Sequence, residues 1–529
     1  IDDVLQTKQV FDLVKLSKES NFFEISHLVL QKYPVENMRR KISYEFLSTI
    51  TFKCLSKLEE YFIRMHPGYK GLRGYFHEYH IEDFRLPIIK VKPDILSDGK
   101  TIRYTNNDLS EIRDNEFEIL ISFVSPVIEG EILSASKKGI ISFHYADTNS
   151  IAERLSPPGF SEVMHGKKSS SFSITMLSAS IDSDIEIIKG KIATSYLYTL
   201  NKIKLYRKSN TFMIRAIEKI LSNNFLESGE LKQYSAKSEV KMPSLSIQFK
   251  YILKTMLLFL KKIKNRLLGR KPIWGVAYQF KSDWNDSPLK EYQIIKNPED
   301  RFLADPFVVY RNNKHFCFME DYSHSKQRGV ISVYEINSDG YSEIGVALEE
   351  EFHLSYPFIF SHENNLYMCP ESHQANEIRI YKCHEFPLNW KLEAILMSGI
   401  TAVDTSIFMI DSKWWLFTNL DSSNMGDYDS ELHIFSSNNL FSNNWKPHSL
   451  NPVIFDSEKA RNGGLIHHND EIYRVFQKQG LDRYGEGFGV ARVTNLNQEE
   501  YHEEIEFQFT SDFVSNALGT HTFNFDNGL

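Results

Sequence analysis

The stretch DPFVVYRNNKHFCFME, Asp305 to Glu320, decides the fold of the second half of this 529-residue chain. It reads as a short apolar strand, a polar turn and a second strand rich in aromatic residues. The pattern returns at a period of about 50 to 60 residues, which is typical of propeller blades or solenoid units. The further copies are YPFIFSHENNLYMCPES from Tyr356, DTSIFMIDSKWWLFTN from Asp404, GGLIHHNDEIYRVFQ from Gly463 and the start of a fifth, HTFNFDNGL, from His521.

These repeats predict an all-β, five-bladed propeller over residues 272–529. Polar turns between alternating strands favour antiparallel sheets over helical repeats. A propeller brings the innermost strand of every blade to one axis. Residues far apart in sequence, such as Asp305, Glu371 and Asp404, are then expected to share one pocket. The segment WGVAYQF, Trp274 to Phe280, is expected to close the ring against the last blade.

The composition of the chain limits the classes of protein to which it can belong. A chain of 529 residues predicts two or three domains, and 42% hydrophobic with 25% charged residues is typical of a soluble globular protein. A net charge of −8 gives no reason to expect nucleic-acid binding. The four cysteines form no CxxC pair, which argues against a disulfide framework and favours a cytoplasmic location. We therefore predict no metal site.

The first 206 residues alternate helical and strand patterns, which predicts a mostly parallel, Rossmann-like α/β domain. The opening residues IDD are interpreted as the tail of a first strand whose start is missing. Sheets of this kind bind ligands at the carboxyl ends of their strands. Helices are expected at 4–17, 39–65 and 128–138, and strands at 23–30, 116–124 and 139–145.

Residues 207–271 are predicted to connect the two domains. They end in QFKYILKTMLLFLKKIKNRLLGRK, Gln248 to Lys271, which is apolar and strongly basic at once. One interpretation is peripheral membrane contact through 248–271, with the helix lying on an anionic surface. The other is a helix packed between domains with its lysines in solvent. We favour the second because the polar face of the helix is incomplete.

A first chemical constellation follows the predicted strand that contains His144. After it come the turn SPPGF, Ser156 to Phe160, a second strand, SFSITML, and then Asp182. A neutral imidazole at His144 is suited to deprotonate an amine nucleophile, and a carboxylate at Asp182 would orient the ring and raise its basicity.

These residues resemble the formyltransferase family, which uses 10-formyltetrahydrofolate to formylate methionyl-tRNA, glycinamide ribonucleotide or amino sugars. The resemblance covers the first domain. It implies that His144 and Asp182 are catalytic and that Pro158 and Gly159 lie in a substrate loop. Ser142 replaces the family's Asn, and losing such an oxyanion donor typically lowers the rate by about 10²- to 10³-fold. The alternative is an inactive domain in which the pair is a relic.

A second constellation consists of carboxylates near strand ends in the repeats: Asp305 in ADPF, Glu320 in FMED, Glu371 in CPES and Asp404 in VDTS. Glycosidic chemistry needs two carboxyls, one as proton donor and one as base or nucleophile. A third carboxylate can hold the donor's pKa high, and Glu320 is predicted to bind substrate. The alternative for any single Asp here is a turn or Asx-type cap.

The propeller half resembles five-bladed glycosidases of the arabinanase and xylosidase type. It is closer still to the propeller region that accompanies plant glucosamine inositolphosphorylceramide transferases. The resemblance implies Asp305 as general base, Asp404 as the residue that tunes the acid's pKa, and Glu371 as acid. Arg461 and Gln477 are predicted to hydrogen-bond a sugar or its phosphate. The segments that carry it are LADPFVVY, SYPFIF, LYMCPES, FPLNW, DTSIFMIDSKWWLF, ARNGGLI and RYGEGFGV.

Three functions remain. In the first, which we prefer, a formyltransferase-like domain acts on an amino sugar beside a glycan-handling propeller, in the synthesis of a bacterial surface polysaccharide. In the second, the propeller is a glycosidase or glycosyltransferase and the α/β domain is an inactive scaffold. In the third, the chain binds glycans without turnover. The expected partner is a sugar nucleotide or glycan, and the sequence does not indicate the oligomeric state.

Overall fold

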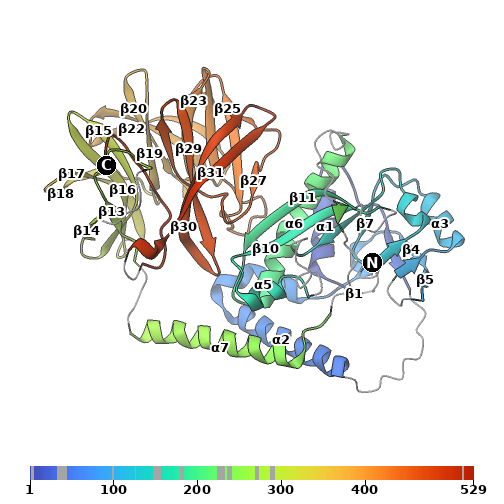
Figure 1. The fold of residues 1–529 in the computed structure, drawn as a ribbon. Coiled ribbons are helices and arrows are strands. Elements are labelled where there is room, and N and C mark those ends of the chain that lie inside the picture. The colour runs from blue at the N-terminus through green and yellow to red at the C-terminus, as the bar shows by residue number, and fades with distance from the viewer. Residues whose placement is uncertain are drawn as a thin grey trace. The chain divides into compact units, whose positions relative to one another are not determined.

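The computed structural model of the chain forms two compact units, Ile1–Ile263 and Lys264–Leu529 (Figure 1). Within the described residues, no helix combines the length and the apolar character needed to cross a membrane. The structure describes residues 1, 5–32, 44–97, 101–124, 127–146, 156–178, 184–222, 233–234, 241–268, 273–285, 292–514 and 517–529.

The first unit is a mixed α/β fold. In its largest sheet, of order β12-β11-β10-β9-β7, β7 and β9 are parallel whereas β9, β10 and β11 pair antiparallel. The prediction of a mostly parallel sheet is therefore met only in part. The strands are β1 (Leu5–Gln6), β2 (Leu28–Gln31), β3 (Tyr79–His80), β4 (Ile88–Val91), β5 (Asp94–Ile95), β6 (Thr101–Arg103), β7 (Leu120–Ser122), β8 (Val127–Glu129), β9 (Ile140–His144), β10 (Ser169–Met176), β11 (Asp184–Ala193) and β12 (Gln233–Tyr234).

Helices cover these strands, and most of α6 is buried. The predicted domain boundary at residue 206 falls inside α6, which packs on β10 and β11. The helix predicted over 128–138 is wrong: Gly130 has φ 90°, which no helix interior adopts, so the chain forms β8 and a short 3-10 turn instead. The helices are α1 (Lys8–Glu19), α2 (Tyr44–Met65), α3 (Asn106–Arg113), α5 (Phe160–His165), α6 (Tyr198–Leu221) and α7 (Leu245–Leu267).

The second unit confirms the predicted all-β propeller architecture. It has four antiparallel sheets whose innermost strands, β15, β19, β23 and β28, contact one another in chain order. The first sheet consists of β15 (Arg301–Arg311), β16 (Lys314–Ser323), β17 (Arg328–Asn337) and β18 (Gly340–Leu348), and the second of β19 (Ser355–His362), β20 (Asn365–Glu371), β21 (Glu377–Glu385) and β22 (Asn389–Ser398). The third consists of β23 (Val403–Ile410), β24 (Lys413–Asn419), β25 (Glu431–Ser437), β26 (Lys446–Pro447) and β27 (Ile454–Phe455). The fourth consists of β28 (Asn462–His468), β29 (Glu471–Gly480), β30 (Arg483–Leu496) and β31 (Tyr501–Thr510).

The repeated polar turns join the first two strands of each sheet. Both central residues of each turn have positive φ, from 48° to 63°, as in type I′ hairpins. Asn and Asp tolerate this region better than other non-glycine residues, which explains their place in the repeat. The pairs are Asn312–Asn313, Glu363–Asn364, Asp411–Ser412 and Asn469–Asp470.

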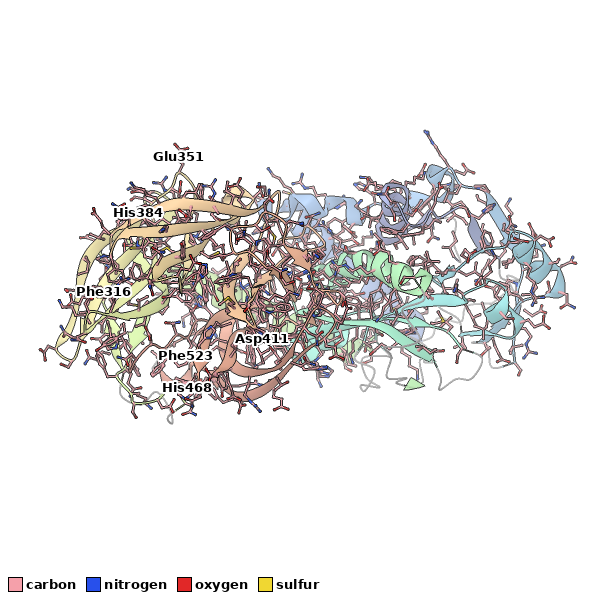
Figure 2. The ribbon with its side chains drawn as sticks, turned by 90° about the horizontal axis from the view of Figure 1, so that it is seen from above. Phe316, Glu351, His384, Asp411, His468 and Phe523 are labelled. Atoms are coloured by element: carbon pink, nitrogen blue, oxygen red, sulfur yellow. The ribbon has the colours of Figure 1, made fainter. Side chains whose placement is uncertain are left out.

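The fifth position of the ring holds β13 (Val276–Tyr278), β14 (Gln293–Ile295) and the C-terminal segment. Phe523 N donates to Gly463 O at 3.0 Å, and Asn524 Oδ1 accepts from Val308 N at 2.7 Å. The C-terminal segment therefore bridges β28 and β15 and closes the ring. WGVAYQF, of which we had expected this role, supplies β13 beside β15, and its Trp274 ring lies 6.0 Å from that of Tyr484 in the last sheet. Figure 2 shows Phe523 among the sheets of this unit, where its ring stacks on Phe488 with centroids 5.3 Å apart.

Ring closure predicts an effect at Gly464. This residue has φ 143°, and a Cβ built there would lie 2.3 Å from the carbonyl oxygen of Phe523. Gly340 has φ 145° but open space around the same position. We expect Gly464→Ala to lower the free energy of unfolding by about 1–3 kcal/mol more than Gly340→Ala. Chemical denaturation of both variants measures the difference, and equal losses would show that the contact with Phe523 does not matter.

Candidate functional site

The innermost strands of three sheets share a backbone irregularity near their first residues. Asp305, Tyr356 and Asp404 have φ of 47°, 45° and 50°, and the strand ladder is interrupted by a bulge at each one. A left-handed conformation costs a non-glycine residue about 1–2 kcal/mol, so the surrounding structure holds it in place. All three side chains are buried.

The second strand of each sheet adds a polar residue at the same level. Glu320 lies opposite Ala304, and Glu371 lies opposite Ser355. In the third sheet Asn419 takes this place, opposite Val403, and in the fourth Gln477 N donates to Arg461 O at 2.7 Å. The propeller therefore brings residues from four sheets to one end of its axis. These residues are Asp305, Glu320, Tyr356, Glu371, Asp404, Asn419, Arg461 and Gln477.

Asp305 is held by the C-terminal segment. Its Oδ1 accepts hydrogen bonds from His521 Nε2 at 2.9 Å and from the Thr522 hydroxyl at 2.7 Å. Burial alone would raise the pKa of Asp305, but the bond and charge of His521, together with Thr522 and Arg461, outweigh burial and lower it. Asp305 therefore carries a negative charge near neutral pH.

Asp404 forms the main ion pair of the cluster. Its Oδ2 accepts from Arg461 Nε at 2.6 Å and from Gln477 Nε2 at 2.9 Å, and Arg461 Nη1 also reaches Asp429 Oδ1 at 2.9 Å. The Arg461 guanidinium lies 4.7 Å from the ring centroid of Tyr484. Arg461 and Gln477, which were predicted to bind a sugar, thus both donate hydrogen bonds to Asp404. Gln477 is fully buried, which leaves Arg461 the better placed of the two to meet a ligand.

Glu371 pairs with a histidine two residues along the chain. His373 Nδ1 lies 2.7 Å from Glu371 Oε1, and this bond raises the pKa of His373. Burial would raise the pKa of Glu371, but the bond from His373 and the charge of Arg461 lower it overall. Glu371 is therefore ionised, which is unsuitable for a proton donor at neutral pH.

Glu320 differs from Asp305 and Glu371, whose pKa values are lowered. Its Oε1 lies 3.5 Å from His353 Nε2, and His353 Nδ1 already accepts from Gly329 N. Burial raises the pKa of Glu320 well above its usual range, and the charges of Asp305 and Glu371 raise it further. Glu320 therefore keeps its proton at pH values where Asp305 and Glu371 have lost theirs. Burial and the charges of Glu371 and Asp305 also raise the pKa of Asp404, against the effect of Arg461.

Aromatic side chains lie beside the Asp305 end of the cluster. The rings of Trp274 and Tyr484 lie 4.2 Å and 5.2 Å from that of His521, and Tyr484 keeps 38% of its surface exposed. Aromatic faces beside carboxylates suit binding of a ligand with both apolar and hydroxyl-bearing faces. Our sequence analysis did not single out Trp274, His353, His373, Asp429 or Tyr484. Of these residues, only His373 could have been found from the local sequence, because it follows Glu371 by two positions in the motif PESH.

The formyltransferase-like constellation is described only in part. Ser142 and His144 lie on β9, whereas Asp182 lies outside the described residues. Burial lowers the pKa of His144 to about 4, and within the described part of the chain its Nε2 has no hydrogen-bond partner. Pro158 and Gly159 lead into α5, and Gly159 O accepts from Asn201 Nδ2 at 3.0 Å. This turn thus has a structural role.

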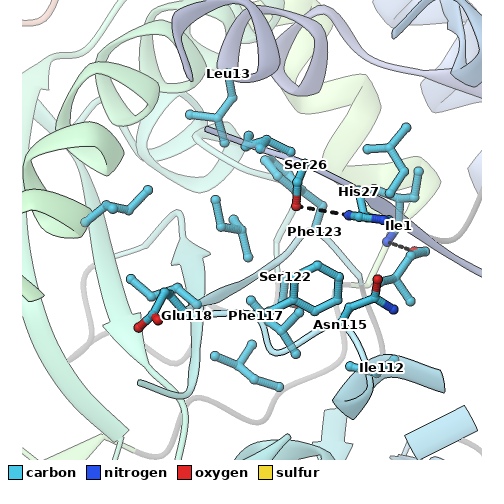
Figure 3. Close-up of a pocket in the computed structure, with 18 of the residues that line it drawn as sticks. Ile1, Leu13, Ser26, His27, Ile112, Asn115, Phe117, Glu118, Ser122 and Phe123 are labelled. Atoms are coloured by element: carbon cyan, nitrogen blue, oxygen red, sulfur yellow. Dashed lines mark hydrogen bonds between the residues drawn. The ribbon is translucent and has the colours of Figure 1, made fainter. Parts of the chain in front are cut away.

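The first unit also contains a cavity of about 430 Å³ (Figure 3). It lies among α1, β2 and β7 and is lined mainly by apolar side chains such as Leu13, Ile112 and Phe117. Ser142, His144, Pro158 and Gly159 are not among its lining residues. This cavity is therefore separate from the predicted formyltransferase-like site.

Comparison with known proteins concerns mainly the propeller. Residues 293–524 match the family model described as glucosamine inositolphosphorylceramide transferase 1, N-terminal. Proteins named glucosamine inositolphosphorylceramide transferase 1 are similar over part of the chain. The one from Oryza sativa subsp. japonica is 36% identical over 208 residues, 38% of this chain and 27% of the relative. The one from Arabidopsis thaliana is 32% identical over 212 residues, 39% and 27%. The chain thus spans about a quarter of their length.

Among solved structures, glycoside hydrolases are similar at low identity. A family 117 enzyme of the marine bacterium Zobellia galactanivorans has a TM-score of 0.32 and 11% identity, covering 45% of this chain and 77% of that one. A thermostable family-43 glycoside hydrolase has a TM-score of 0.33 and 12% identity, covering 44% and 86%. No activity transfers to this chain at such identity.

The pKa of Glu320 predicts a pH-dependent effect on stability. Because folding raises this pKa, the stability that wild-type Glu320 contributes is complete below about pH 4 and falls as pH rises toward the folded-state pKa. Gln has no proton to lose. We therefore expect Glu320→Gln to unfold at a higher denaturant concentration than wild type at pH 7 and at a similar one at pH 4. A difference in unfolding midpoint between variant and wild type that is the same at both pH values would contradict the raised pKa.

Proposed function

We propose that the propeller unit binds a glycan or glycoconjugate at the carboxylate cluster and catalyses substitution at its glycosidic carbon. The observation that carries this proposal is that the pKa values of two buried carboxyl groups, Glu320 and Asp305, are shifted in opposite directions. Burial and like charges raise the pKa of Glu320, while His521, Thr522 and Arg461 outweigh burial and lower the pKa of Asp305. Carboxyl groups whose pKa values are pushed apart in one pocket are the pattern of an acid and a base.

The proposed step uses Glu320 as proton donor. Glu320 protonates the leaving oxygen as the glycosidic C–O bond breaks, and Asp305 takes the proton of the incoming hydroxyl as the new C–O bond forms. Water as the incoming group gives hydrolysis, and another hydroxyl gives transfer. The donor role that the resemblance implied for Glu371 passes to Glu320, because Glu371 is held ionised by His373 and Arg461. Asp404 then positions Arg461 through their ion pair.

The plant relatives favour a glycoconjugate over a free sugar as ligand. Their name states a transferase for glucosamine and inositolphosphorylceramide. We extend from this name only the class of ligand, a saccharide joined to a phosphate-bearing group. Arg461 is the cation in the cluster suited to meet a phosphate or a sugar hydroxyl.

Two substitutions test the acid and base. We expect Asp305→Asn and Glu320→Gln each to lower turnover by about 10²- to 10⁴-fold. Release of the aglycone from a panel of aryl glycosides, and transfer to added oligosaccharides followed by mass spectrometry, provide the measurement. Asp411→Asn and Glu385→Gln are the matched controls and should keep full activity. Asp411 shares the positive φ of Asp305, 49° against 47°, and both control side chains are exposed.

Glycan binding without turnover is the outcome that would contradict this step. If the wild-type protein binds an oligosaccharide saturably but no product forms in either assay, the pocket is a lectin-like site. If the controls lose activity as the site variants do, the loss reflects folding rather than chemistry.

Formyl transfer to an amino sugar is a second proposal, with 10-formyltetrahydrofolate as donor. One observation favours it: burial keeps the His144 imidazole neutral, and its Nε2 is shielded without a partner among described residues. We assign no folate contact, because the cavity of this unit is lined elsewhere. His144→Ala should abolish formylation of a nucleotide-linked amino sugar while leaving glycan turnover unchanged. No formylated product from the wild-type protein would refute the proposal.

A further inference from the structure

Helix α7 turns an apolar stripe toward solvent. Six of its apolar residues follow the i, i+3, i+4, i+7 pattern of an amphipathic helix, which places them on one face. Their exposed fractions are Phe249 67%, Ile252 46%, Leu253 42%, Met256 49%, Leu260 53% and Ile263 52%. A surface helix of a globular protein normally turns such a stripe inward. Helix α7 therefore has the opposite orientation, with its apolar face toward solvent.

The opposite face of α7 is fixed to the first unit by polar contacts. Gln248 Nε2 donates to Ser48 O at 2.7 Å, and Lys254 Nζ donates to Val163 O at 2.7 Å. The Tyr251 hydroxyl donates to buried Glu59. Rotating the helix to hide its apolar stripe would break these buried bonds, so the outward orientation belongs to the folded unit.

Helix α2 carries a second outward stripe. Its inner side is buried through Phe52, Glu59 and Ile63, and the bond from Gln248 to Ser48 joins it to α7. Figure 1 shows both helices at the same edge of the first unit. The exposed apolar residues of α2 are Leu47 44%, Ile50 42%, Leu58 53%, Tyr61 58%, Phe62 55% and Met65 66%.

The charge beside the α7 stripe is entirely positive. Residues 245–267 contain no Asp or Glu, although the whole chain has a net charge of −8. A second copy of the chain docked on this face would bring two sets of like charges together, whereas an anionic surface would neutralise them. The basic residues of α7 are Lys250, Lys254, Lys261, Lys262, Lys264 and Arg266. Two of them contact the first unit, Lys254 through Val163 O and Lys262 through the ring of Tyr196.

We propose that α2 and α7 form a docking surface for an anionic lipid bilayer. The apolar stripes enter the boundary between headgroups and acyl chains, and Lys250, Lys261 and Lys264 contact lipid phosphates. The helices lie on the bilayer and do not cross it. The interpretation that we favoured from sequence, a helix packed between domains with its lysines in solvent, does not by itself account for the exposed apolar face of α7.

Vesicle co-sedimentation of the full chain tests this surface. We expect binding to vesicles of phosphatidylcholine with phosphatidylserine and much weaker binding to phosphatidylcholine alone. Leu253→Gln with Leu260→Gln should lower the partition coefficient by at least about tenfold. The matched control is Leu388→Gln with Leu392→Gln in the second unit, whose exposed fractions, 40% and 46%, are close to 42% and 53%. This control should bind as wild type does.

The electrostatic part is tested separately. Lys250→Gln and Lys261→Gln should each lower binding to the anionic vesicles by roughly fivefold, and added salt should do the same. Three outcomes would overturn the proposal: no binding of the wild-type chain to anionic vesicles, equal loss in the control pair, or a solution dimer that dissociates with Leu253→Gln and Leu260→Gln while vesicles are not bound. Glycan assays do not bear on any of these outcomes.

Discussion

The guanidinium of Arg461 compensates part of the charge of the carboxylates gathered at the propeller axis. It donates from Nε to Asp404 and from Nη1 to Asp429, at 2.6 Å and 2.9 Å. Carboxylates buried together without a cation would take up protons, because like charges in a water-poor site cannot all ionise. Arg461, together with His521 beside Asp305 and His373 beside Glu371, lets these two carboxylates stay charged while Glu320 keeps its proton. The difference that acid–base chemistry needs therefore depends on these three partners.

The repeated backbone supplies the frame for that cluster, and the side chains supply its chemistry. The same left-handed position at the start of three innermost strands carries Asp305, Tyr356 and Asp404. Because the backbone geometry repeats while the residue changes, each sheet can present a different group at the same level. Closure of the ring by the C-terminal segment then adds His521 and Thr522 to Asp305, so that ring closure and site formation depend on the same segment.

The two units carry different kinds of surface. The propeller gathers charge in a buried cluster, whereas the first unit exposes apolar stripes on α2 and α7 beside lysines. A glycoconjugate with a lipid part is the class of ligand that would make use of both properties, since its saccharide suits the cluster and its lipid resides in a bilayer. The two proposals rest on separate observations, and either can fail without the other.

The sequence by itself determined the propeller, its hairpins and the set of carboxylates, because strand alternation, turn residues and repeat period are local properties of the chain. It also predicted the helix over most of 248–271. Only the tertiary structure decided that Glu320 and not Glu371 keeps its proton, since burial and the charges of Asp305 and Glu371, which lie on other strands, raise the pKa of Glu320. The same holds for α7: local periodicity defines an apolar face, but the buried contacts of Gln248 and Tyr251 determine that this face points into solvent.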